Sequence, residues 1–168
     1  HATIRRQRQM CIRDRYFGSR SGGFWKTTDG GANWQGGSTD FLMAAGVNTI
    51  AVSPANPDSI LINVRNSQNG TSHGLYRSTD GGVSWAESNF NPATLGTGGL
   101  GTSFEIYKIA YHPTIPNKVL IGTDQGLYVS NDNLQTWARP LSSGDITNVV
   151  FHPTDPNVIY VYDNLSLI

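Results

Sequence analysis

The stretch "GLYRSTDGGVSW" (residues 74–85) decides the fold, because looser copies of it recur on both sides. The copies are "GGFWKTTDGGANW" (residues 22–34) and "GLYVSNDNLQTW" (residues 126–137). Each copy contains an aspartate five residues before a tryptophan. Such a motif belongs either to a chemical group that is used repeatedly or to a structural unit that repeats. The pairs are Asp29 and Trp34, Asp80 and Trp85, and Asp132 and Trp137.

A second motif alternates with the first. It reads "NTIAVSPANPDSILI" (residues 48–62), "YKIAYHPTIPNKVLI" (residues 107–121) and "TNVVFHPTDPNVIYV" (residues 147–161). Each copy has two short apolar, β-branched runs around a Pro-x-x-Pro turn, a pattern that indicates two buried strands. The aspartate motif adds a third and a fourth strand around a hairpin turn.

The repeating unit is therefore a four-stranded antiparallel meander. Its period of about 40–50 residues is typical of a β-propeller. We predict an all-β propeller fragment with two full blades, residues 47–88 and 106–140. A half-blade made of the last two strands of a blade should precede them. A half-blade made of the first two strands should follow.

Both ends of the chain depart from this pattern. The stretch "RRQRQMCIRDR" (residues 5–15) matches the translation of a transposase sequencing adapter. The stretch "LSLI" (residues 165–168) matches the opposite strand of the same adapter. We therefore expect residues 1–15 and 165–168 to be adapter-derived and residues 16–164 to be a partial propeller.

This division changes the charge of the protein. The whole chain has 12 basic and 12 acidic residues, but five arginines and one aspartate precede Tyr16. Residues 16–164 thus hold seven basic and eleven acidic residues, a formal charge of −4, and lack the single cysteine, Cys11. We expect no nucleic-acid partner, no disulfide and no cysteine-ligated metal. The sequence also shows no membrane span.

The pattern Ser/Thr-x-Asp-x-Gly-x-Thr/Ser-Trp resembles the Asp-box, or BNR, repeat. That repeat occurs in sialidases, sortilin-type receptors, xyloglucanase-like glycosidases and photosystem-assembly propellers. The alternation with the proline motif is most similar to the sortilin-type and xyloglucanase-like group. The resemblance covers residues 16–164 and implies a β-propeller, but it implies no single activity, because such blades host many.

Turn chemistry favours a structural role for the aspartates. A carboxylate at the start of a hairpin can accept backbone N–H groups just beyond it. The glycines can take the positive φ of a tight turn, and the tryptophans can return as apolar anchors. Calcium takes about six to eight oxygen ligands, whereas each loop offers one carboxylate, so we expect no metal and no cofactor. Calcium binding by these loops is the alternative. The residues expected to shape the blades are Asp29, Gly31, Trp34, Asp80, Gly82, Trp85, Asp132 and Trp137.

Alternate turns of a meander lie on the same side of its sheet. The proline and aspartate turns should therefore share one face. The hairpins between second and third strands should share the other face with the blade-to-blade connections. Loop lengths vary on this second face, for example "NSQNGTSHG" (residues 66–74) against "TDQG" (residues 123–126), and extended loops on a rigid scaffold concentrate binding residues. The candidate ligand residues there are Asp40, Phe41, His73, Phe104, Glu105, Asp124 and Asp145.

Several of these candidates have a structural alternative. The three aspartates could be solvated turn formers, and the two phenylalanines could cover the blade core. His112 and His152 precede prolines at matching positions. They could form a two-histidine metal site or serve as turn residues.

No catalytic set is complete in the sequence. The sialidases that it resembles use an arginine triad, a Tyr–Glu pair and an acidic Asp. After residue 15 the only arginines are Arg20, Arg65, Arg77 and Arg139, and the last two flank the aspartate turns. We therefore expect a secreted or cell-surface module that binds a peptide or a glycan. The alternative is part of a glycoside hydrolase, xyloglucanase-like or sialidase-like, whose catalytic carboxylates lie in other blades.

Overall fold

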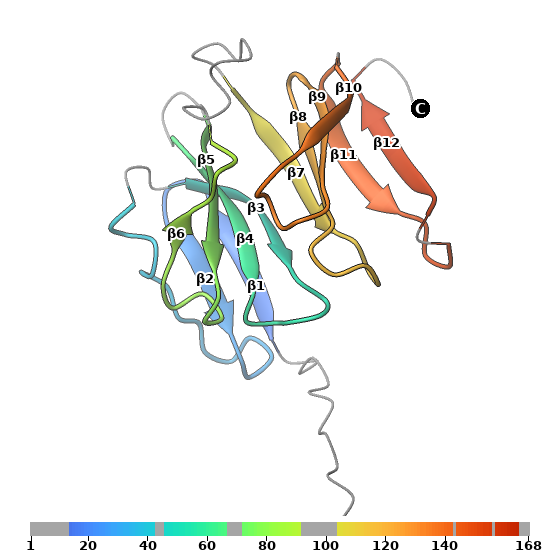
Figure 1. Ribbon diagram of the computed structural model, residues 1–168. Coiled ribbons are helices and arrows are strands. Elements are labelled where there is room, and N and C mark those ends of the chain that lie inside the picture. Colours follow the sequence, from blue (N-terminus) through green and yellow to red (C-terminus); the bar gives the residue numbers. More distant parts are fainter. Residues whose placement is uncertain are drawn as a thin grey trace, which may run out of the picture.

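The structure is a computed structural model. It describes residues 14–42, 46–66, 72–91, 104–142, 144–155 and 157–164. Within these ranges the chain forms antiparallel sheets (Figure 1). Residues 1–13 and 165–168 lie outside the described residues, so their assignment to adapter sequence stays a prediction.

Four sheets stand side by side in chain order (Figure 1). The second and third sheets are complete meanders, β3 to β6 and β7 to β10, which confirms the predicted all-β fold with two full four-stranded units. Their strands are β3 Gly46–Val52, β4 Ile60–Arg65, β5 Ser72–Ser78, β6 Ala86–Glu87, β7 Ile106–Tyr111, β8 Val119–Thr123, β9 Gly126–Ser130 and β10 Ala138–Leu141.

The fourth sheet contains the first two strands of a repeat, β11 Ile146–Phe151 and β12 Ile159–Asp163, as predicted. The first sheet differs from the prediction. It pairs β1 Arg15–Ser19 with β2 Gly23–Thr27, so its first strand begins one residue before the expected start at Tyr16.

The pairing register shows which strands of a blade the first sheet contains. Phe24 pairs with Gly18, as Leu75 pairs with Asn63 one repeat later, so β1 and β2 are second and third strands. The fourth strand is reduced to a single bridge between Lys26 and Gln35. The expected third strand is therefore present as β2, the expected fourth strand is reduced to this bridge, and the second strand, β1, was not predicted. Gly36, which follows the bridge, lies so close to Trp25 that a Cβ would be 2.7 Å from the indole ring.

The apolar core lies between neighbouring sheets. Along β4 the side chains alternate, as a strand requires: Ile60 and Ile62 belong to the cluster shared with Phe24 of the first sheet, whereas Leu61 belongs to the cluster shared with the third sheet. A further cluster joins the third and fourth sheets through Leu120, Ile146 and their neighbours. Each large side chain buried in this way contributes about 1.5–3 kcal/mol, so each sheet depends on its neighbours.

The first strand of each sheet packs against the sheet before it. In β3, β7 and β11 the pairing shifts register after the first or second residue, which marks a bulge. The carbonyl just before the bulge meets the second strand of the preceding sheet. A Cβ on Gly18 would lie 2.3 Å from Val47 O, and one on Gly122 would lie 2.4 Å from Ile146 O. Two of these junctions therefore require glycine.

The turns and the loops lie on two different faces of the sheets, as predicted. On the turn face, Gly81 N–H donates to Asp58 O (2.9 Å) and Asn133 N–H donates to Asn117 O (2.9 Å), which joins the second and third aspartate turns to proline turns. On the loop face, Asp124 N–H donates to Glu105 O (3.1 Å), which joins a hairpin to a sheet-to-sheet connection.

Candidate functional site

The carboxylate of Asp80 organises its own turn. Its Oδ1 accepts the backbone N–H groups of Val83 (3.1 Å) and Ser84 (2.9 Å) and the hydroxyl of Ser78 (2.7 Å). Its Oδ2 accepts the hydroxyl of Ser84. The Ser78 hydroxyl oxygen in turn accepts the N–H of Gly82 (2.8 Å). Both oxygens of the carboxylate are thus used within the hairpin.

The same arrangement recurs in the other two turns. Asp29 accepts the backbone N–H (2.9 Å) and the side-chain amide (2.8 Å) of Asn33. Asp132 accepts the backbone N–H (2.9 Å) and the hydroxyl (2.6 Å) of Thr136. Gly31 (φ 106°) and Gly82 (φ 92°) have the expected positive φ, and Leu134 adopts it too (φ 68°).

The three tryptophans differ in burial. Trp85 is 8% exposed, lies edge-on to Phe24 (4.9 Å between ring centroids) and donates its indole N–H to Ser38 Oγ (3.1 Å). Trp137 is partly buried against the core between the second and third sheets. Trp34, on the outer side of the first sheet, is 37% exposed. Trp85 and Trp137 therefore each pack against a core between two neighbouring sheets.

These hydrogen bonds predict an acid-labile fold. The hydroxyl and backbone N–H of Thr136 lower the pKa of Asp132 from 3.8 to about 2, and similar donors lower the pKa values of Asp29 and Asp80. Because the folded pKa lies below the unfolded value of about 3.9, the stabilisation is complete above that value and is lost as pH falls through the folded pKa. We expect urea denaturation to show lower stability from about pH 4 down to about pH 2.

Asp132→Asn supplies the control for this prediction. The asparagine cannot titrate, so the stability difference between wild type and Asp132→Asn should shrink as pH falls through this window. A difference that stays constant between pH 6 and pH 2 would contradict the assignment.

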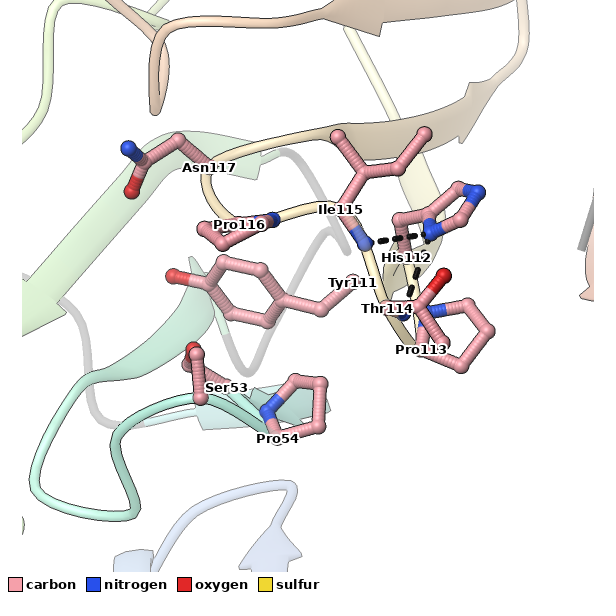
Figure 2. A pocket seen from close by; sticks show the side chains of 10 residues that line it. Ser53, Pro54, Tyr111, His112, Pro113, Thr114, Ile115, Pro116 and Asn117 are labelled. Carbon is pink, nitrogen blue, oxygen red and sulfur yellow. Dashed lines mark hydrogen bonds between the residues drawn. The ribbon is translucent and has the colours of Figure 1, made fainter.

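The turn face uses its histidines internally. His112 Nδ1 accepts the N–H groups of Thr114 (3.1 Å) and Ile115 (2.8 Å), beside a pocket of about 190 Å³ between two proline turns (Figure 2). His152 Nδ1 accepts the N–H groups of Thr154 (3.2 Å) and Asp155 (3.0 Å) in the same way. Each Nδ1 therefore organises a turn. Within the described ranges, no three His, Cys, Asp or Glu side chains are grouped to hold a metal ion.

The loop face brings three of the predicted ligand residues together. Glu105 precedes β7, Asp124 lies in the β8–β9 hairpin, and Asp145 precedes β11. Burial raises the pKa of Tyr107, and the nearby carboxylates of Asp145, Asp124 and Glu105 raise it further. Three carboxylates from separate segments thus act on one phenol.

Burial also acts on the carboxylates themselves. It raises the pKa of Glu105 and outweighs the opposing effect of Arg65, whose Nη2 lies 3.4 Å from Glu105 Oε1. Burial likewise raises the pKa of Asp124, and Asp145 adds to the shift. Among the described residues, the buried atoms Glu105 Oε2 and Asp124 Oδ1 have no hydrogen-bond partner. These oxygens can accept hydrogen bonds from a ligand.

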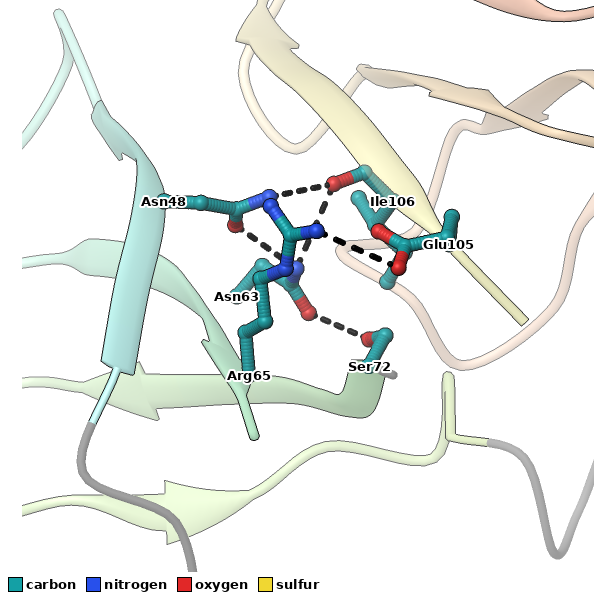
Figure 3. A network of polar contacts seen from close by, with 6 residues as sticks. All are labelled: Asn48, Asn63, Arg65, Ser72, Glu105 and Ile106. Carbon is teal, nitrogen blue, oxygen red and sulfur yellow. Dashed lines mark hydrogen bonds and ion pairs between the residues drawn. The ribbon is translucent and has the colours of Figure 1, made fainter. Parts of the chain in front are cut away.

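A buried amide network fixes the base of this site (Figure 3). Asn63 is fully buried and donates to Asn48 Oδ1 (2.7 Å) and to Ile106 O (3.3 Å). Asn48 Nδ2 also donates to Ile106 O (2.9 Å), and the hydroxyl of Ser72 donates to Asn63 Oδ1 (2.5 Å). Because Ile106 follows Glu105 directly, this junction between the second and third sheets positions the glutamate.

The remaining predicted ligand residues lie elsewhere. Phe104 is completely buried, with an exposed fraction of 0%, and its ring packs near Phe90 in the core. Its burial in the core agrees with the structural alternative stated for Phe104 and not with a place on the ligand face. Asp40 and the 66%-exposed Phe41 belong to the first sheet's connection to β3, and His73 lies on β5. Within the described part of the chain, none of these three residues contacts the carboxylates of Glu105, Asp124 and Asp145.

Sequence reasoning missed two arginines of the site. Arg65 ends β4 and pairs with Glu105. Arg139 was expected beside an aspartate turn, but its guanidinium donates to the backbone oxygens of Gln125 and Ser142 (3.0 Å) on the loop face. The side chain is long enough to run along β10 over the ring of Tyr128, 5.4 Å from its centroid. No spacing rule for the aspartate turn indicates this direction.

The repeated meanders, with cores between sheets and each first strand packed on the sheet before it, define a β-propeller, and this chain is a set of its consecutive blades. Within the described ranges, the chain contains no helix with the length and apolarity to span a bilayer. No protein-family model and no curated protein matches the chain.

Solved structures share the fold. An ancestral GH74 enzyme has a TM-score of 0.69 and 24% identity over 92% of this chain and 21% of its own. A GH74 enzyme from Niastella koreensis has a TM-score of 0.63 and 22% identity over 89% of this chain and 24% of its own. YCF48 bound to D1 peptide has a TM-score of 0.58 and 16% identity over 90% of this chain and 48% of its own. The chain thus spans less than half the length of these proteins.

Proposed function

We propose that this propeller is a secreted or cell-surface binding module of the Asp-box class that holds a peptide or a glycan on its loop face. The observation that carries the proposal is the pair of buried carboxylate oxygens, Glu105 Oε2 and Asp124 Oδ1, which have no partner among the described residues. A buried acceptor without a donor costs about 1–3 kcal/mol. A ligand that supplies N–H or O–H groups offsets this cost.

The contrast between the faces supports binding on the loop side. On the turn face, both oxygens of each turn aspartate and the Nδ1 atoms of His112 and His152 are engaged in their own turns. On the loop face, the Nε of Arg139 is also buried without a partner among the described residues. The loop face therefore offers both donors and acceptors to a ligand.

A peptide with a basic side chain fits this site best. Three carboxylates face two arginines there, and residues 16–164 carry a formal charge of −4. Fold-level similarity to YCF48, which was solved with the D1 peptide, adds support for a peptide.

The test compares two probe sets on the intact protein by biolayer interferometry: a library of lysine- and arginine-containing peptides and a panel of xyloglucan oligosaccharides. Glu105→Gln and Asp124→Asn should each weaken peptide binding by about tenfold or more, since a hydrogen bond to a charged group contributes about 1.5–3 kcal/mol. Asp155→Asn removes one negative charge from the turn face and should leave binding unchanged. An equal loss of peptide binding in all three variants would show that only the net charge of the protein matters, and it would contradict the proposal.

A glycoside hydrolase is the second candidate. The similarity to GH74 enzymes favours it, as do three carboxylates near one another at a blade junction. Release of reducing ends from xyloglucan by the intact protein, lost in Glu105→Gln or Asp124→Asn, would favour the enzyme. Peptide binding without such release would favour the binding module.

A further inference from the structure

A second pocket lies away from the loop face, at the junction between the second and third blades. It has a volume of about 320 Å³ and is lined by the end of β5, by β6 and the residues around it, and by the next aspartate turn. A pocket of about 320 Å³ occupies the equivalent place at the junction between the first and second blades. The repeat therefore creates this hollow at successive junctions.

A positively charged side chain joins the two blades at each of these junctions. Lys26 Nζ donates to Gly81 O (3.1 Å), and Arg77 Nη2 donates to Asn133 O one repeat later. Gly81 and Asn133 each follow the aspartate of their turn and have positive φ (74° and 59°), so the turn directs its carbonyl toward the preceding blade. These contacts join the pocket walls of neighbouring blades.

The two pockets differ in chemistry. The first contains Phe24, Gly36 and Val83, and its Lys26 ammonium is used by Gly81 O and by the ring of Tyr16, 5.7 Å away. The second has Glu87 at the place of Gly36 and Gln135 at the place of Val83. Its polar side chains therefore stand where the first pocket has small or apolar ones.

The second pocket also contains a buried donor. The Nε of Arg77, which lines the pocket, has no partner among the described residues. Trp85 forms an apolar wall, and Glu87 and Gln135 add an acceptor and an amide. Arg77 and Glu87 have opposite charges, so an ion of either sign would meet a like charge. A neutral ligand with several hydroxyl groups and an apolar face satisfies all of these groups.

We propose that the pocket lined by Arg77, Trp85, Glu87 and Gln135 binds a neutral monosaccharide unit, in addition to the ligand of the loop face. The hydroxyl groups of the sugar accept from the arginine and donate to the glutamate, while one face of the ring lies against the tryptophan. The site is separate from the loop-face carboxylates, so it adds a peripheral contact to glycan whatever the loop face binds.

Saturation-transfer difference NMR on the intact protein tests this proposal with the methyl β-glycosides of glucose, galactose and xylose as probes. At least one should bind with a dissociation constant on the order of millimolar, as expected for a ligand with about a dozen non-hydrogen atoms. Glu87→Ala and Gln135→Ala should each reduce the signal at least about fivefold. Both residues are exposed, so the thermal midpoint should change little.

Val83→Ala is the matched control, since Val83 occupies the place of Gln135 in the first pocket and is 74% exposed. It should leave the signal unchanged. Absence of transfer from all three glycosides would overturn the proposal. Transfer that survives both Glu87→Ala and Gln135→Ala would overturn it as well.

Discussion

Gly82→Leu should lower the free energy of unfolding by about 3 kcal/mol or more, because overpacking costs about 1–3 kcal/mol and a left-handed leucine about 1–2 more. A Cβ on Gly82 would lie 2.6 Å from the ring of Phe24 in the preceding blade. One repeat later, Leu134 adopts the same positive φ with an exposed fraction of 1%. Leu134 is buried in the cluster that contains Leu75, which stands where the first blade has Phe24. Urea denaturation followed by tryptophan fluorescence measures the effect.

This comparison predicts a compensating pair at each junction: phenylalanine opposite glycine, or leucine opposite leucine. Phe24→Leu introduced together with Gly82→Leu should recover much of the lost stability, with a coupling energy of about 1 kcal/mol or more. At the next junction, Leu134→Gly should cost about 2–5 kcal/mol through the cavity it leaves, and Leu75→Phe should partly restore it. If the changes in unfolding free energy were additive within both pairs, the side chains at the two positions would not compete for the same space.

Asn63→Leu should cost about 2–4 kcal/mol, since it leaves buried polar groups without partners at about 1–3 kcal/mol each. Leucine keeps the branching of asparagine, but the hydroxyl of Ser72 loses its acceptor and Asn48 Oδ1 loses its donor (Figure 3). Chemical denaturation of the variant and of wild type under the same conditions gives the difference.

Ser72→Ala separates the polar contribution from packing. In wild type it removes two hydrogen bonds, the one to Asn63 Oδ1 and the one that Ser72 Oγ accepts from Gly74 N–H (3.1 Å), and it should cost about 2 kcal/mol. In the Asn63→Leu background the hydroxyl has already lost its acceptor, so the same change removes only the contact with Gly74 N–H and should cost about 1 kcal/mol less than in wild type. If Asn63→Leu were as stable as wild type, the network would contribute nothing to the blade junction. Because Ile106 O belongs to the network and follows Glu105, the same variant should also weaken ligand binding on the loop face.

Much of the fold could be predicted because its signals are local. The proline motif and the aspartate motif each specify a turn, and apolar runs of strand length flank them, so order and pairing of the strands follow from the sequence. The positive φ of Gly31 and Gly82 also follows from the turn type. In the first sheet, strand β1 was missed because the local signal is weak there: β1 has no proline turn before it, and it begins within a stretch that resembles adapter sequence.

The candidate site could be predicted only in part. Glu105, Asp124 and Asp145 could be placed on one face because the meander puts their loops there, and their role in ligand binding stays a prediction. Arg65 and Arg139 were missed, since the direction of a long side chain along a strand depends on the neighbours it meets. Both a place on the ligand face and one in the core were stated for Phe104, for a related reason: an aromatic residue in a connection can face solvent or the core, and the cluster with Phe90 decides it.

The sequence by itself determined the repeat, the four-stranded unit and the turn that each aspartate builds, because these depend on residues within a few positions of one another. Only the tertiary structure decided how one blade meets the next. The carbonyl of Val47 or Ile146 against a glycine, the amide network of Asn63 and the cations that reach the following turn all join residues far apart in the chain. Such contacts depend on shape and hydrogen-bond geometry across a junction, which periodicity along one strand does not contain.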